Sequence, residues 1–144
     1  MALDPKIPWT SVVTMMDAYG ASFDTSGMLR IYDNTGAVPT NCDDAANVNG
    51  AVLLAELTLA ADAFGACGAA TGIITAGTIT ADSSANAAGT AAFARYFKTG
   101  GVTAGFQGLC ALTSGGDFNI ATSLTISLGA NVSCSAATIT MLRE

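Results

Sequence analysis

The side chains that could do acid–base or nucleophilic chemistry are few in this chain. The sequence contains no histidine, which removes the usual general base near neutral pH and the commonest zinc ligand. Serine and threonine are abundant, but only the lysines Lys6 and Lys98 could activate them as amine bases. The composition therefore predicts that the protein is not an enzyme and uses no cofactor.

The carboxylates are scattered, and the glycine-rich stretch lacks the other residues of a phosphate-binding loop. Asp43 and Asp44 are the one adjacent pair of acids, in a long loop expected over 33–50. A calcium loop needs oxygen ligands at alternating positions such as D-x-D-x-D, which this loop does not supply. The glycines of 65–72 are not followed by Lys-Ser or Lys-Thr. We therefore expect neither a metal site nor a phosphate site.

The cysteines are widely spaced, and no C-x-x-C pair occurs, which excludes the common zinc and iron–sulfur spacings. They could be small buried apolar side chains. They could also form one or two disulfides outside the reducing cytosol, or bridges between subunits. Four cysteines allow three intrachain connectivities, and the spacing does not choose among them. The candidate disulfide residues are Cys42, Cys67, Cys110 and Cys134.

Residues 87–101, AAGTAAFARYFKTGG, gather two of the five basic residues of the chain, Arg95 and Lys98, among three aromatic rings. Rings and cations together could read a nucleic acid. The net charge of −6 disfavours this, because binding to phosphates needs a cluster of Lys and Arg. We therefore expect no nucleic-acid partner.

The pattern of the same stretch favours a β-strand with one face packed into the core. With a period of two, Phe93, Arg95 and Phe97 share one face, and Tyr96 lies on the other. We expect one face to pack into the core and the other to form a half-exposed patch, in which a cationic stem lies across a ring. Tyr, Phe and Arg are enriched in interface cores. The candidate interface residues are Trp9, Phe93, Arg95, Tyr96 and Phe97.

The chain around these residues divides into a short first segment and one β-rich domain. Residues 1–25 predict an N-terminal arm or short helix, with Thr10 or Ser11 as its N-cap and a stop at Gly20. From Ser26 to the end, residues 26–144, short β-like runs alternate with turns rich in Gly, Asn, Asp and Ser.

Four runs carry the fold prediction. Residues 28–32 alternate as a half-buried strand, and 51–60 form the clearest strand, although Ala and Leu leave a helix possible. The run 73–81 is interrupted at Gly77, which indicates a bulge or bend. The segment 124–140 predicts a hairpin that turns at GAN. Together they predict an all-β, antiparallel β-sandwich, jelly-roll-like, with one short N-terminal helix or arm.

No apolar run approaches the roughly 20 residues of a membrane span, and the N-terminus has no basic region leading into an apolar one. We expect no membrane partner, no signal peptide, and synthesis in the cytoplasm. Charged residues make up only 11% of the chain. So little charge suits a surface that packs against other proteins.

Three segments resemble a group of small structural proteins of tailed bacteriophages. These segments are GMLRIYDNTGAVPTNCDDAANVNGAVLLAELTL, GIITAGTITADSSANAAGTAAFARYFKTGG and LTISLGANVSCSAATIT, which together cover most of 27–140. The shared pattern consists of strands and turns. Phe93, Ala94 and Arg95 stand where that group often has Trp-Phe-Arg.

The resemblance implies a virion structural protein, assembled in the host cytoplasm and located in the virion. The first hypothesis is a capsid decoration, or cement, protein that binds and stabilises the major capsid lattice, with Trp9 on an arm that reaches a neighbour. Its partners would be the major capsid protein or other virion subunits, and it would form a homo-oligomer, a trimer or dimer. The alternatives are a tail, collar or baseplate component, or a receptor- or carbohydrate-binding module.

Overall fold

The structure is a computed structural model that describes residues 7–42, 48–120 and 123–141. Within these ranges the chain forms one helix, α1 (Trp9–Ala21), followed by strands only. The strands are β1 (Met28–Tyr32), β2 (Leu53–Leu59), β3 (Ile73–Thr75), β4 (Ile79–Thr80), β5 (Gly89–Thr90), β6 (Phe93–Phe97), β7 (Ala104–Leu112), β8 (Phe118–Ile120), β9 (Thr125–Ile126) and β10 (Thr138–Thr140).

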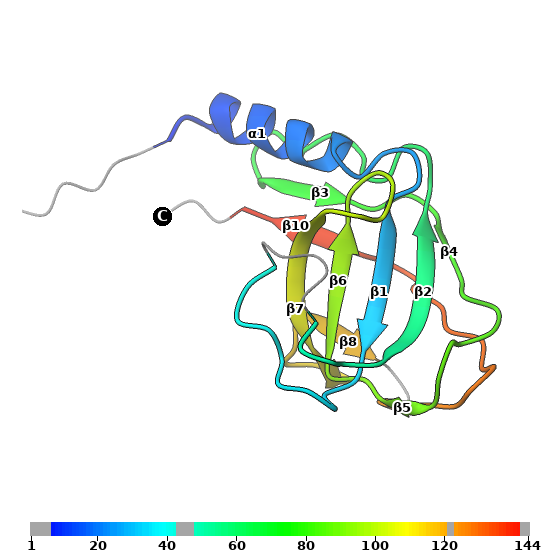
Figure 1. Cartoon of the computed structure of the whole chain (residues 1–144). Coiled ribbons are helices and arrows are strands. Elements are labelled where there is room, and N and C mark those ends of the chain that lie inside the picture. The colour runs from blue at the N-terminus through cyan, green and yellow to red at the C-terminus, as the bar shows by residue number, and fades with distance from the viewer. Residues whose placement is uncertain (1–6, 43–47, 121–122, 142–144) are drawn as a thin grey trace, which may run out of the picture.

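The main sheet has six strands in the order β4-β2-β1-β6-β7-β8, and it curls around the core (Figure 1). Two further ladders join β10 to β3 and β5 to β9. The expected β-rich chain with one short helix is confirmed, but an antiparallel arrangement throughout is wrong because β7 and β8 pair in parallel. The short return between them passes through Thr113 and Gly115, which both have positive φ (69° and 91°).

Two predicted strands have the expected place. The run 28–32 is β1, and the run 51–60 is the strand β2 rather than a helix. Three buried leucines, Leu54, Leu57 and Leu59, give β2 most of its packing. Burial of such side chains is worth about 2 kcal/mol each, which outweighs the weak helix preference of Ala and Leu.

The helix α1 starts earlier than predicted and packs against the β-rich domain. Its N-cap is Pro8 rather than Thr10 or Ser11, and no side chain caps it. Val12 and Met16 are each 2% exposed and belong to the main core. The helix is therefore part of the folded body.

The predicted interruption at Gly77 separates two ladders. β3 pairs with β10, while β4, after the glycine, pairs with β2. The N–H of Gly77 donates to the carbonyl of Ala63, and a Cβ at Gly77 would lie 3.0 Å from the carbonyl oxygen of Asp62. A side chain there would push the carbonyl of Asp62 aside by a few tenths of an ångström, which the small glycine avoids.

The hairpin predicted at GAN is wrong. β9 pairs with β5, and β10 pairs with β3. A turn does form, since the N–H of Ala130 donates to the carbonyl of Ser127. The chain then leaves it, because Val132 exchanges two backbone hydrogen bonds with Asp82.

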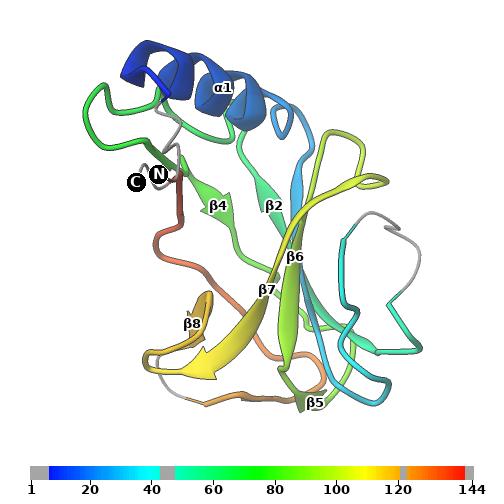
Figure 2. The same ribbon diagram turned by 90° about the vertical axis from the view of Figure 1, so that its left-hand side faces the viewer.

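The main sheet buries side chains on both faces. Its inner face packs on α1, on Phe23 and on Ile74 of β3 in the larger core cluster. Its outer face carries a second cluster around Tyr32, Phe93 and Phe97, which the long loop after β1 covers (Figure 2).

Candidate functional site

The register of the main sheet lines up four polar side chains on its outer face. Glu56 of β2 lies opposite Arg30 of β1, which lies opposite Arg95 of β6. Arg95 in turn lies opposite Gln107 of β7. We call Glu56, Arg30, Arg95 and Gln107 the polar row. It is the largest group of polar side chains that adjacent strands bring together in the described part of the chain.

The first half of the polar row is half-exposed. Nε of Arg30 lies 2.5 Å from a carboxylate oxygen of Glu56, and the two side chains are 23% and 34% exposed. Another guanidinium nitrogen of Arg30 donates to the carbonyl of Gly101 at 3.1 Å. The guanidinium also lies 4.4 Å from the ring centre of Phe97. Water screens such a pair, so it adds little to stability.

The second half of the polar row is buried. Arg95 is 0% exposed, and its Nε donates to the side-chain oxygen of Gln107 at 2.7 Å. Its guanidinium also donates to the carbonyl of Asn41 at 3.1 Å, and the amide of Gln107 donates to the carbonyl of Pro39 at 2.7 Å. Both long side chains therefore fasten the loop 33–42 over the sheet. Such bonds are what allows a charged group to be buried.

Most of the predicted interface residues lie inside the fold. The pairing confirms that Phe93, Arg95 and Phe97 share one face while Tyr96 points to the other. All four are at most 2% exposed, so none offers its side chain to a partner. The half-exposed patch is absent at these positions because the loop covers it. In the sequence, only the unusual length of that loop indicates that it covers other residues.

Trp9, the fifth predicted interface residue, is half-buried at the start of α1. Its ring lies 3.2 Å from the point that a Cβ at Gly72 would occupy. Gly72 has φ +63°, so the loop before β3 can pass close beneath the indole. An interface role for Trp9 stays a prediction.

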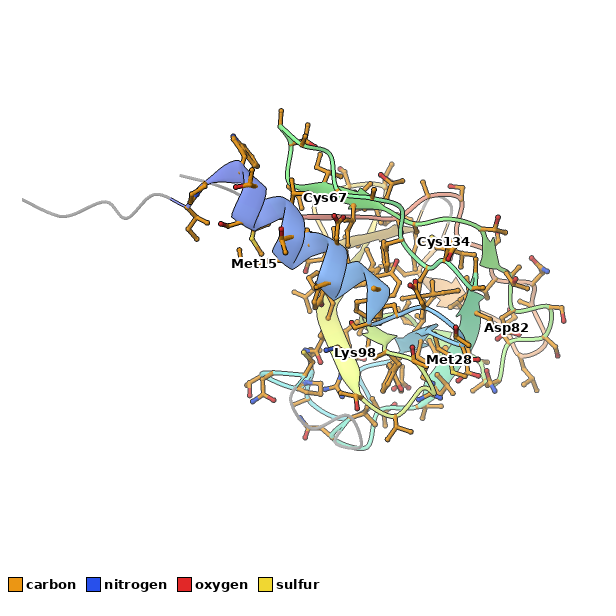
Figure 3. The ribbon with its side chains drawn as sticks, turned by 90° about the horizontal axis from the view of Figure 1, so that it is seen from above. Met15, Met28, Cys67, Asp82, Lys98 and Cys134 are labelled. Carbon is orange, nitrogen blue, oxygen red and sulfur yellow. The ribbon has the colours of Figure 1, made fainter. Side chains whose placement is uncertain are left out.

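The predicted disulfide within the chain is wrong, because all four cysteines are free thiols, whereas bridges between subunits stay a prediction. Cys42 lies in the long loop, Cys67 before β3, Cys110 on β7 and Cys134 before β10. Figure 3 shows Cys67 and Cys134 well apart. Burial raises the pKa of the thiols of Cys67 and Cys134, and it raises the pKa of Cys110 to about 12. These three thiols are protonated at neutral pH and react slowly.

The aspartates have a structural role that the sequence did not reveal. Carboxylates of five aspartates each accept a backbone N–H, four from segments remote in the chain and one, that of Asp117, from the preceding strand. In each case the local sequence shows an isolated acid, and nothing identifies the donor. The donor and acceptor pairs are Cys67 to Asp17, Ala63 to Asp24, Val52 to Asp33, Glu56 to Asp82 and Leu109 to Asp117.

Asp33 is the most buried of these acids, at 9% exposed. Burial alone would raise its pKa. Hydrogen bonds from the hydroxyl of Thr35 and from the amides of Val52 and Thr35 outweigh burial, so the pKa of Asp33 lies below its usual range. The carboxylate is therefore charged at neutral pH and joins the end of β1 to the start of β2.

No group of three or more potential metal ligands occurs in residues 7–42, 48–120 and 123–141. Asp43 and Asp44, the adjacent acids, lie outside these ranges. A groove of about 620 Å³ lies between α1 and β10. Its lining is mostly apolar and comprises Met15, Met16, Tyr19, Ile139, Thr140 and Met141.

Among the described residues, no helix is both long and apolar enough to cross a membrane. The chain matches no protein-family model, no curated protein and no solved structure.

Proposed function

We propose that this protein is a structural protein of a tailed-bacteriophage virion, a capsid decoration (cement) protein that binds and stabilises the major capsid lattice. The observation that carries the proposal is that polar side chains hold the fold together while large apolar side chains are exposed. The buried arginine and the aspartates hold the fold, whereas several large apolar side chains face the solvent. These exposed side chains are Ile7, Met15, Val52, Val102, Leu109, Leu112 and Leu128.

A surface with much apolar and little charged area favours contact with other proteins. A folded unit that bridges neighbouring capsid subunits adds buried area to each of them, and the gain repeats over the whole shell. Closed symmetry suits the sites of a lattice, so a trimer or dimer is the proposed assembly. The resemblance in 27–140 supports the same assignment, since its motifs form β1, β2 and β6 at the centre of the fold.

The proposal includes a finer description of the fold. The curled sheet and the β3–β10 ladder are taken as the two layers of a jelly-roll-like sandwich. In support, Ile74 of β3 is 0% exposed and joins the same core cluster as Leu29 and Leu57 of the main sheet.

The α1–β10 groove is the proposed contact with the capsid. Met15 is 42% exposed, lines this groove, and lies on the outer side of α1 (Figure 3). Mixing the protein with undecorated capsids should give saturable binding at a number set by the lattice. Met15→Glu should weaken this binding at least about tenfold, because it places a charge in an apolar contact.

The matched control is Ala18→Glu, which adds the same charge at an exposed position of α1 outside the groove. It should bind like the unchanged protein. Absence of any association with capsids would refute the capsid role. Mass spectrometry of intact virions would then separate the alternatives, since a few to dozens of copies indicate a collar, tail or baseplate. Clear hits on a glycan array would instead indicate a carbohydrate-binding module.

A further inference from the structure

One edge of the main sheet is open along most of its longest strand. β8 pairs only with Cys110–Leu112 at the end of β7, and within the described ranges no strand pairs with Ala104–Leu109 on that side (Figure 1). The N–H of Cys110 donates to the carbonyl of Ala92 on the β6 side. By alternation, the backbone groups of Gln107 and Leu109 point to the open side.

Two side chains from elsewhere in the chain occupy backbone groups on this edge. The hydroxyl of Tyr19, on α1, donates to the carbonyl of Gly105 at 2.6 Å. The carboxylate of Asp117, in the turn before β8, accepts the N–H of Leu109 at 2.9 Å. We call Tyr19 and Asp117 the edge guards.

The strand itself lacks the charges and prolines that often protect an edge. Its sequence, AGFQGLCAL, contains no proline and no charged residue. Leu109 and Leu112 are 54% and 49% exposed. Natural edge strands avoid pairing with other chains through charges, prolines, bulges or a covering element. Here a bulge opposite Tyr96 and Phe97 and the edge guards take that role.

We propose that the open edge of β7 is a latent self-association surface whose partner is β7 of a second copy, and that the edge guards hold it closed. In antiparallel pairing centred on Gln107, Gly105 of one copy lies opposite Leu109 of the other. The carbonyl and the N–H that would then bond to each other are the two that the edge guards occupy.

Charge complementarity favours the same partner. The Cε of Lys98 lies 3.3 Å from the point that a Cβ at Gly105 would occupy, and Asp117 lies against Gly108. Figure 3 shows Lys98 close to β7. A two-fold axis through Gln107 would place Lys98 of each copy beside Asp117 of the other. The same carboxylate would thus exchange a backbone donor for an ammonium group. This inference does not depend on the proposed function.

The test is the association state of Tyr19→Phe, the guard variant, measured by sedimentation equilibrium with circular dichroism as the check of folding. It frees the carbonyl of Gly105 on each copy and keeps the Asp117 carboxylate for Lys98 of the other copy, so self-association should tighten at least about tenfold. Hydrogen exchange at the Gln107 amide should be fast in the unchanged protein and slow in the associated variant.

Two controls make the result specific to β7. Tyr96→Phe makes the same chemical change at a buried ring that is not on this edge, and it should leave association unchanged. Adding Leu109→Lys to the guard variant should restore the original state, because it places a charge on the edge. The proposal is overturned if the folded guard variant associates no more tightly, if Leu109→Lys fails to reverse its association, or if the Gln107 amide is already slow in the unchanged protein.

Discussion

Burial decides what each arginine of the polar row does. Arg30 and Arg95 lie opposite each other on adjacent strands, yet one is half-exposed beside Glu56 and the other is fully buried against Gln107 and Asn41. Water competes for the first set of bonds and not for the second. The buried arginine therefore carries the larger share of stability.

Replacing these arginines should separate the two cases. Arg95→Ala should lower the free energy of unfolding by about 3 kcal/mol, because it removes the bonds that the buried guanidinium donates to the side-chain oxygen of Gln107 and to the carbonyl of Asn41. Arg30→Ala should cost only about 1 kcal/mol. Urea unfolding of both variants measures the difference. Equal losses would mean that burial does not set their contributions.

Two tyrosines make an opposite pair of predictions. The hydroxyl of Tyr96 is buried and has no hydrogen-bond partner in the described part of the chain. Tyr96→Phe should therefore leave the free energy of unfolding unchanged or raise it by up to about 1 kcal/mol. Tyr19→Phe should lower it by about 1 kcal/mol, since it loses the bond to Gly105. Urea midpoints at low protein concentration measure both, and a clear loss in Tyr96→Phe would contradict the first.

At the scale of elements, turns and loops are fastened to the strands by single polar side chains. Asp33 joins β1 to the residue before β2, and Asp82 accepts the N–H of Glu56 in the middle of β2. Arg95 and Gln107 fasten the loop 33–42 to β6 and β7. Short strands of two or three residues gain little from their own ladders, so these bonds fix where the chain goes next.

Asp33 should make stability depend on pH. Because its pKa in the folded protein lies below the unfolded value of 3.8, the unfolded state binds the proton more readily. The contribution is complete above that unfolded value and is lost as the pH falls through the folded pKa. Urea midpoints measured between about pH 2 and pH 7 should thus fall more steeply in the unchanged protein than in Asp33→Asn. Parallel curves would show that Asp33 is not the group responsible.

At the scale of the whole molecule, the helix and the sheet share one core. Met16 of α1 lies in the same cluster as Phe23, Leu57 and Ile74. Chains of this size with one continuous core unfold in a single transition. The predicted boundary between an N-terminal segment and a β-rich domain therefore does not separate two cores among the described residues.

This shared core predicts one cooperative unfolding transition. Trp9 is the only tryptophan and lies on α1, so its fluorescence reports the helix, while the β-sheet component of the infrared amide I band reports the strands. The two midpoints should coincide on heating. Met16→Ala should lower the free energy of unfolding by about 3 kcal/mol, and both midpoints should fall together. A fluorescence change that precedes the loss of β structure would show that α1 unfolds separately.

The amino-acid sequence by itself determined the local structure. The period of two in 28–32 and 51–60 predicted β1 and β2, and the alternation in β6 placed Phe93, Arg95 and Phe97 on one face. Gly77 predicted a bend that exists. Each of these features depends on residues that are neighbours in the chain, which is why local patterns suffice.

Only the tertiary structure decided which segments meet. The parallel return of β8, the separate partners of β9 and β10, and the loop over Arg95 all join residues remote in sequence. The same holds for the free thiols and for the aspartates that accept distant N–H groups. Such contacts depend on the relative stability of alternative packings of the whole chain, which no local pattern contains.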